Sequence, residues 1–95
     1  QNVDSIPKSG GVYKVLRNDG VTGKLTRVYV GKAVDLRSRY NGHLSVTETN
    51  TCLKNNLKNK ECYFRYALLA GEQARANAEA DLLANGKYEC NSQGQ

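Results

Sequence analysis

Three short segments of the chain alternate apolar and polar residues, a pattern that indicates half-buried β-strands. They cover residues 12–16, 26–30 and 61–69. Turn-forming residues, Asn18-Asp19-Gly20 and Thr22-Gly23, separate the first two segments. Because a short polar connection with glycine favours a hairpin, the first two strands are expected to pair antiparallel.

Helical patterns lie between and after these strands. Asp35 is suited to cap a helix that runs to Leu44, and apolar residues recur within it every four positions. A short helix is expected around residues 52–58, after a threonine-rich loop at residues 47–51. An alanine-rich helix is expected over residues 72–85, with Gly86 ending it. The pattern therefore predicts an α+β domain with a three-stranded antiparallel sheet flanked by helices.

One carboxylate of the last predicted helix points toward the interior. On a helical wheel Glu79 falls between Leu82 and Leu83, whereas Asp81 falls on the polar side with Asn77. A carboxylate is buried only at a cost of several kcal/mol unless a cation or a metal compensates its charge. Glu79 is therefore either a metal ligand or an acid that pairs with an arginine or reaches solvent at the core boundary.

Length and charge restrict the class of protein. Ninety-five residues make one domain with a small core, and no apolar stretch is long enough for a transmembrane helix. Fourteen Lys and Arg against nine Asp and Glu give a net charge of +5. Five basic residues fall in one stretch: Lys24, Arg27, Lys32, Arg37 and Arg39. Such a stretch is typical of nucleic-acid binding, and a solvated basic face is the alternative.

The cysteines and the single histidine offer no zinc site. Cys52, Cys62 and Cys90 contain no Cys-x-x-Cys pair, and His43 is the only imidazole. Free thiols in a reducing compartment are expected, which predicts a cytoplasmic protein, and one disulfide between two of the three is the alternative. The chain contains no Met, even at position 1, so it is expected to be a single domain (residues 1–95, core 10–91) excised from a longer polypeptide.

Several motifs together resemble a nuclease signature. Gly11-Val12-Tyr13 is followed by Tyr29-Val30-Gly31-Lys32-Ala33, then by Asp35-Leu36 and Arg39, and later by Glu79 and Asn91. Over residues 11–91 this series resembles the GIY-YIG nucleases, among them excision-repair enzymes and phage homing endonucleases. Either short motif alone is uninformative, but Arg39 ten residues after Tyr29 and Asn91 twelve after Glu79 make the combination specific. Valine replaces isoleucine in both motifs, and no proline precedes Asn91.

The resemblance implies a metal-dependent endonuclease that hydrolyses phosphodiester bonds in DNA. Glu79 would hold one Mg²⁺ or Mn²⁺ ion, and Arg39 would clamp the phosphate oxygens. Tyr13 and His43 are alternative general bases, or Tyr13 passes its proton to His43. Lys32 would lower the pKa of Tyr13, which is otherwise only about 0.1% ionised at neutral pH.

The remaining expectations concern supporting residues and partners. Tyr29 would position water or phosphate, and Asn91 would fix the closing loop. Lys14, Arg27 and Arg37 are expected to contact DNA. A parent chain would supply a recognition domain or a regulatory partner, and a delivered toxin domain is the alternative to a cytoplasmic enzyme.

Two non-catalytic functions stay open at this point. The first is a nucleic-acid-binding module on the same fold that no longer cuts. The second is an RNA-binding α+β domain in which Tyr13, Tyr29 and Tyr63 stack on bases.

Overall fold

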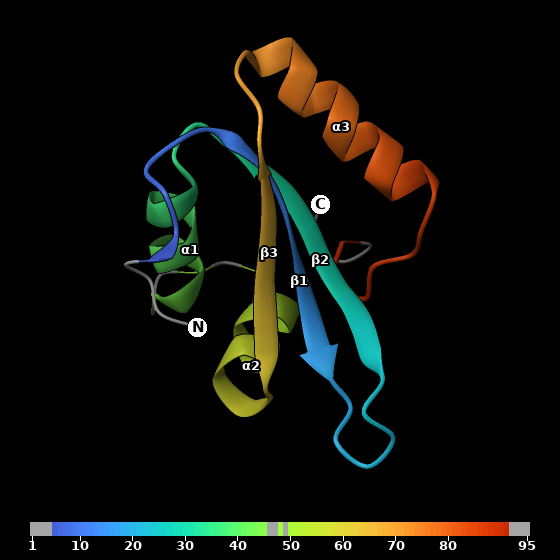
Figure 1. Cartoon of the computed structure of the whole chain (residues 1–95). Helices are drawn as coiled ribbons and strands as arrows, with labels where there is room; N and C mark the ends of the chain where they lie inside the picture. Colours follow the sequence, from blue (N-terminus) through green and yellow to red (C-terminus); the bar gives the residue numbers. More distant parts are fainter. Residues whose placement is uncertain (1–4, 46–47, 49, 92–95) are drawn as a thin grey trace.

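The computed structural model describes residues 5–45, 48 and 50–91 and contains one three-stranded antiparallel sheet (Figure 1). Its strands are β1 (Gly11–Asn18), β2 (Leu25–Ala33) and β3 (Cys62–Leu68), in the order β2-β1-β3. The predicted hairpin and the α+β class are confirmed, and each strand lies where the alternating pattern predicted it.

The strand register fixes which side chains share a face of the sheet. Tyr13 of β1 pairs with Gly31 of β2 and with Tyr66 of β3, and two residues later Val15 pairs with Tyr29. Because side chains alternate along a strand, Tyr13 and Tyr29 point to the same face. A β-bulge follows Val15.

Three helices surround the sheet: α1 (Leu36–Leu44), α2 (Thr51–Asn59) and α3 (Glu72–Ala84). The Asp35 carboxylate caps α1 as predicted, since it accepts a hydrogen bond from the Ser38 amide at 3.0 Å. Asn50 caps α2 in the same way. The predicted threonine-rich loop at residues 47–51 lies partly outside the described residues, and Thr51 begins α2.

The helices α1 and α3 lie on opposite sides of the sheet (Figure 1). The buried core forms between the sheet and the helices α1 and α2, and it includes the side chains of Ile6, Tyr13, Val15, Val28, Leu36, Tyr40, Leu53 and Phe64. The helix α3 contributes no buried residue. The helical wheel predicted that Glu79 and Leu83 face the interior and that Asp81 faces solvent. Glu79 is half-buried and Asp81 is exposed, as predicted, but Leu83 is 41% exposed, so the prediction is wrong for this residue.

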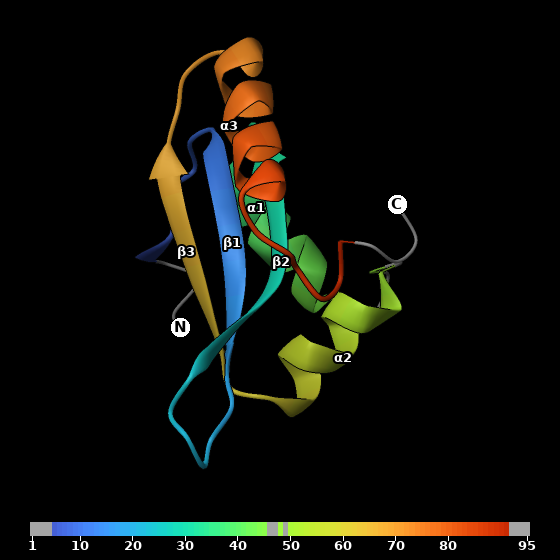
Figure 2. The same ribbon diagram turned by 90° about the vertical axis from the view of Figure 1, so that its right-hand side faces the viewer.

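After α3 the chain turns back along β2 and reaches α2 (Figure 2). The amides of Glu89 and Cys90 donate to the carbonyls of Arg27 and Val28, at 3.1 and 2.7 Å. Gly86 follows the α3 cap as predicted, but without the left-handed φ that such a glycine often adopts. The segment after α3 is therefore held in place by its hydrogen bonds to β2, and not by a left-handed glycine cap at the end of the helix.

A disulfide joins Cys52 of α2 to Cys90, so the expectation of three free thiols is wrong. Only Cys62 is free. The sequence could not reveal this pair, because the two cysteines are 38 residues apart and meet only when the last segment folds back.

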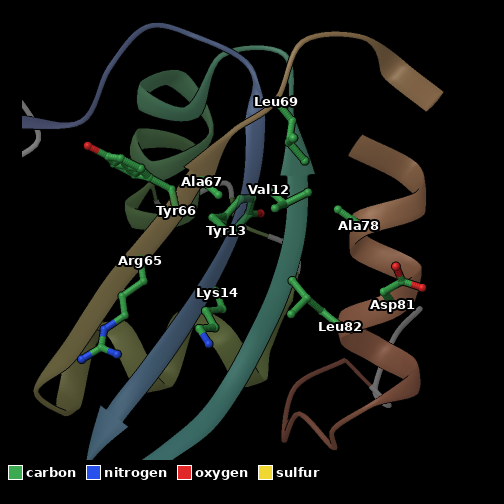
Figure 3. A pocket seen from close by; sticks show the side chains of 10 residues that line it. All are labelled: Val12, Tyr13, Lys14, Arg65, Tyr66, Ala67, Leu69, Ala78, Asp81 and Leu82. Atoms are coloured by element: carbon green, nitrogen blue, oxygen red, sulfur yellow. The ribbon is translucent and has the colours of Figure 1, made fainter. Parts of the chain in front are cut away.

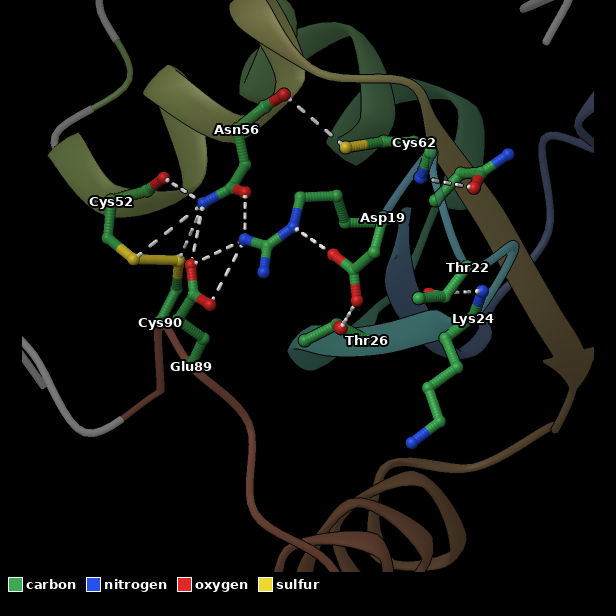
Figure 4. A network of polar contacts seen from close by, with 12 residues as sticks. Asp19, Thr22, Lys24, Thr26, Cys52, Asn56, Cys62, Glu89 and Cys90 are labelled. Carbon is green, nitrogen blue, oxygen red and sulfur yellow. Dashed lines mark hydrogen bonds and ion pairs between the residues drawn. A yellow bond between two sulfur atoms is a disulfide. The ribbon is translucent and has the colours of Figure 1, made fainter.

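An ionic network beside the disulfide strengthens the same junction (Figure 4). The Arg17 guanidinium of β1 donates to Asn56 of α2 and to Glu89 of the returning segment, both at 2.8 Å, and to Asp19 at 3.0 Å. The Arg17 side chain thus links β1, α2 and the segment that follows α3. Within the described residues, no helix is long and apolar enough to cross a membrane.

Candidate active site

Tyr13 lies in the middle strand with its side chain buried, only 2% exposed. Its ring packs directly over Gly31, where an added Cβ would lie 2.5 Å from the phenolic oxygen. No side chain other than hydrogen leaves room there, so Gly31 is needed for the close approach of two neighbouring strands. The glycine of the second motif therefore makes space for the tyrosine of the first.

The Tyr13 phenol is hydrogen-bonded to the only histidine. Its oxygen lies 2.6 Å from Nε2 of His43, which comes from the last turn of α1 and is 5% exposed. The Tyr29 ring meets His43 edge-on, with 5.5 Å between ring centroids, and lies 6.1 Å from the Tyr13 ring. Two strands and one helix thus bring three predicted site residues together.

Burial sets the protonation of these rings. It raises the pKa of Tyr13, as do the neighbouring Tyr29, Glu48 and Glu79, while Arg39 opposes the shift. Burial also lowers the pKa of His43, although Glu48 counteracts this effect. At neutral pH the pair is therefore a protonated phenol beside a neutral imidazole.

The prediction that Lys32 lowers the pKa of Tyr13 is wrong. Lys32 pairs with Val12, so its side chain lies on the sheet face opposite the Tyr13 ring. The cation that does lower this pKa is Arg39, and its effect is smaller than that of burial.

Arg39 is an exposed residue of α1 beside a depression of about 280 Å³, which Asp35, Ser38 and Gly42 also line. Its charge acts on Tyr13, Tyr29 and His43 alike. Among the described residues, no ion pair or hydrogen bond engages its guanidinium. The Arg39 guanidinium is thus available to bind an anion near the phenols on which its charge acts.

Glu79 of α3 is half-buried, and its carboxylate makes no hydrogen bond or ion pair with the residues that the structure describes. The alternative that it pairs with an arginine is therefore not realised there. After burial, the charge of Glu79 is the next cause of the raised pKa of Tyr29, and it also raises that of Tyr13. The charge of the Glu79 carboxylate thus acts on both phenols.

The donor chemistry around Glu79 fits a hard, hydrated cation. A carboxylate that no described residue engages suits Mg²⁺, which keeps several waters and binds through one or two carboxylates and substrate phosphate. The described residues contain one denser group of metal-binding side chains, Cys52, Glu89 and Cys90. Its two sulfurs are joined in the disulfide, so that group does not bind a metal through thiolates.

Asn91 fastens the last described segment to β2. Its side-chain amide pairs with both backbone groups of Val30: Oδ1 accepts from the amide at 2.8 Å, and Nδ2 donates to the carbonyl at 2.9 Å. Val30 lies between Tyr29 and Gly31. The segment is therefore held at the strand that carries Tyr29.

Glu48 is a neighbour of the site that the sequence analysis missed. Its carboxylate lies 3.3 Å from Nδ1 of His43, and its side chain is 15% exposed. It is the only acid between Asp35 and Glu61, which is the one signal that could have pointed to it.

Comparison with known proteins identifies the fold. No protein-family model and no curated protein matches this sequence. The magnesium-bound N-terminal endonuclease domain of UvrC from Thermotoga maritima superposes with a TM-score of 0.71, at 20% identity, over 94% of this chain and 90% of that one. The chain has the GIY-YIG fold.

Two variants of the same Thermotoga maritima domain agree. A tyrosine-to-phenylalanine mutant bound to its catalytic divalent cation gives a TM-score of 0.71, at 20% identity, over 94% of this chain and 89% of that one. An asparagine-to-alanine mutant gives 0.69, at 20% identity, over 92% and 87%. At this identity the likeness concerns the GIY-YIG fold alone.

The basic residues predicted to contact DNA are not part of the cluster around Tyr13. None of Lys14, Arg27 and Arg37 is among the groups that shift the pKa of Tyr13, Tyr29 or His43. Arg27 is exposed, whereas the half-buried Arg37 donates to the Ile6 carbonyl at 2.7 Å.

Lys14 lies on the other face of the GIY-YIG sheet. There it lines an apolar groove of about 420 Å³ between α3 and the strands β1 and β3, and Ala78 and Leu82 face Val12 across it (Figure 3). Tyr13 also lines this groove, whereas Arg39, His43 and Glu79 do not.

Proposed function

We propose that this chain is a metal-dependent endonuclease that hydrolyses phosphodiester bonds in DNA. The observation that carries the proposal is the buried 2.6 Å hydrogen bond between Tyr13 and His43, with Arg39 and Glu79 acting on the same phenol. The similarity to endonuclease domains with a catalytic divalent cation supports it. A domain that merely bound nucleic acid would not need a buried phenol–imidazole pair on which the charges of Arg39 and Glu79 act.

The phosphate would bind at Arg39. A guanidinium offers two parallel N–H groups to the non-bridging oxygens of a phosphate, and that of Arg39 is exposed and not engaged by the described residues. Tyr29, half-buried beside His43, would position the attacking water or the phosphate.

The general base would be the Tyr13–His43 pair acting together. Because the pKa of Tyr13 is raised, a free phenolate is too rare to act alone. Tyr13 would instead take the proton of the attacking water as it gives its own to neutral His43. Of the alternatives that the sequence left open, this is the one in which Tyr13 passes its proton to His43.

Glu79 would hold a single Mg²⁺ or Mn²⁺ ion through its carboxylate. When bound, such an ion supplies stabilisation of the negative charge on the scissile phosphate and the leaving oxygen. Asn91 would serve as structural support by keeping the end of the domain against β2.

The proposed setting is a domain of a longer protein, with the rest of the parent chain supplying recognition. Disulfides persist in oxidising compartments, and the Cys52–Cys90 pair therefore favours a delivered nuclease over one that stays in the reducing cytoplasm. Its DNA contacts would include Arg27, which is exposed, while Lys14 and Arg37 are half-buried and would contribute less.

Nicking of supercoiled plasmid with and without Mg²⁺ tests the function. We expect cleavage that EDTA abolishes, and loss of cleavage in Glu79→Ala and Arg39→Ala with unchanged circular dichroism. Asp81→Ala, an exposed acid of the same helix, and Arg65→Ala, an exposed arginine of β3, are the matched controls and should cleave normally. Cleavage retained in Glu79→Ala would remove the metal-ligand assignment.

The same samples separate the alternatives. Salt-sensitive DNA binding by the unmodified protein without any Mg²⁺-dependent cleavage would identify a binding module. Preference for single-stranded RNA that is indifferent to Glu79→Ala would identify an RNA-binding domain.

A further inference from the structure

We propose that Glu48 is a positioning residue that holds His43 as the proton acceptor for Tyr13. A chain of three side chains would then run from the Glu48 carboxylate through the imidazole to the phenol. The role of these three side chains in catalysis rests on the proposed nuclease function, whereas the orientation of His43 can be tested without that function.

The geometry around the imidazole carries the inference. Nε2 of His43 is 2.6 Å from the Tyr13 oxygen, and Nδ1 is 3.3 Å from Oε2 of Glu48. Nδ1 is fully buried and makes no well-directed hydrogen bond, so the Glu48 carboxylate is the acceptor that the structure offers it. Both ring nitrogens of one buried histidine are thus assigned to different partners.

An ionised carboxylate only accepts hydrogen bonds, so its position beside Nδ1 favours the tautomer that carries the proton there. The lone pair of Nε2 then faces Tyr13, whose phenol is protonated. The opposite tautomer would place a proton on Nε2 and could not accept the one from Tyr13. Glu48 therefore selects the only neutral form of His43 that can work as a base.

The remaining charges around His43 do not provide this selection. Besides Glu48, five titratable or charged residues contact His43, act on its charge or line the pocket next to it. They come from β1, β2, α1 and α2 and are Tyr13, Tyr29, Arg39, Lys54 and Lys58. Arg39, Lys54 and Lys58 are cations, and a cation cannot accept the Nδ1 proton. Glu48 is the anion among these neighbours.

In the proposed step, the Tyr13–His43 pair removes a proton from the attacking water. The water oxygen bonds to phosphorus while its proton passes to the Tyr13 oxygen, and the Tyr13 proton passes to Nε2 of His43. The bond from phosphorus to the leaving oxygen breaks, and that oxygen keeps the electron pair and is protonated by solvent. The resulting imidazolium faces the Glu48 carboxylate until it releases its proton to solvent.

Because His43 is the only histidine, nitrogen-15 NMR of the full chain reads its tautomer directly. We expect the proton of the neutral ring on Nδ1 in the unmodified protein. Glu48→Gln should shift the ring toward a mixture of tautomers and lower the pKa of His43, because a stabilising negative charge is lost. Glu48→Asp should restore part of both effects, and Glu72→Gln, an exposed acid on α3, should change neither.

Activity supplies the second readout. Glu48→Gln should slow single-turnover plasmid cleavage about 10- to 100-fold, by analogy with the loss seen when a group that orients a metal-binding histidine is removed. The acidic limb of its pH–rate profile should move to lower pH with the pKa of His43.

Three results would overturn the inference: a proton on Nε2 in the unmodified protein, a tautomer that Glu48→Gln leaves unchanged, or cleavage by that variant at the normal rate and pH. If Glu48→Gln does not fold, the spectrum of the unmodified protein and of Glu48→Asp decides. Absence of cleavage by the unmodified protein would contradict the nuclease function, and the NMR experiment would still decide whether Glu48 orients His43.

Discussion

The Tyr13 oxygen and Nε2 of His43 lie 2.6 Å apart, although thirty positions separate the two residues in sequence. This contact joins the central strand to the last turn of α1. It places a protonated phenol against a neutral imidazole, and the charges of Arg39 and Glu79 reach the same phenol.

Replacement of Arg39 by lysine should not preserve activity. Lysine keeps the positive charge but is a point donor that cannot bind two phosphate oxygens in the guanidinium geometry. Loss of one charge-assisted hydrogen bond is worth about 1.5–3 kcal/mol, which predicts a reduction of about 10- to 100-fold in kcat/KM. Single-turnover cleavage measures it, and a variant as fast as the unmodified protein would contradict the bidentate contact.

Gly31→Ala should disturb Tyr13 rather than the strand. The new Cβ would meet the phenolic oxygen at 2.5 Å, so the ring must move away from His43. We expect a loss of about 1–3 kcal/mol in the free energy of unfolding, as for other overpacked cores, together with loss of cleavage. Urea unfolding and plasmid nicking check the two effects.

Gly42→Ala is the matched control for this substitution. Gly42 lies within α1, and an added Cβ there has no heavy atom within 4 Å. Alanine at such a helical position should raise the free energy of unfolding by about 0.5–1 kcal/mol. Equal losses in the two variants would mean that the contact with Tyr13 is not the cause.

Mild acid should destabilise the fold through His43. Burial lowers the pKa of this histidine, so the unfolded chain binds its proton at a higher pH than the folded one. The free energy of unfolding should therefore be highest above about pH 6.5, the ordinary histidine pKa, and fall as the pH drops from there toward the pKa of folded His43.

Urea unfolding between about pH 5 and pH 8 measures this dependence, with His43→Gln as the variant that should lack it. Asp19 and Glu89, whose pKa values are lowered by their hydrogen bonds, lose their stabilising contribution only in stronger acid. An unmodified protein whose stability is constant across this range would show that His43 is not held neutral by burial.

The disulfide should stabilise the domain and the segment that carries Asn91. Removal of a link that closes a loop of 38 residues is expected to lower the free energy of unfolding by about 3–4 kcal/mol. Because Asn91 follows Cys90 directly and binds Val30, the Val30 amide should exchange its hydrogen faster in Cys90→Ser. Denaturant titration and hydrogen exchange measure the two effects.

Cys62→Ser is the control, since Cys62 is free and serine can keep its hydrogen bond to the Asn56 carbonyl. It should change stability by less than the Cys90 variant. A thiol titration of the denatured, unreduced protein should find one reactive thiol. Three thiols would contradict the disulfide and the oxidising compartment that it favours.

Local pattern was sufficient for the helices and strands. The period of two in residues 12–16 and the capping aspartate at position 35 act over a few neighbouring residues, so the sequence predicts them without knowledge of the rest. The motif residues were also recognisable, because their spacing is a property of the chain. The prediction that Lys32 lowers the pKa of Tyr13 was wrong because it neglected the pleat of the strand. The pleat places the Lys32 side chain on the sheet face opposite the Tyr13 ring.

By itself, the sequence determined the α+β class, the hairpin, and which residues could supply a phenol, an imidazole, a guanidinium and a carboxylate. The tertiary structure decided that Tyr13 meets His43, that Glu48 lies behind the imidazole, and that Cys52 pairs with Cys90. Each of these contacts joins residues brought together by loop closure or by packing against the sheet. Such contacts depend on the balance of the whole fold, so no local pattern records them.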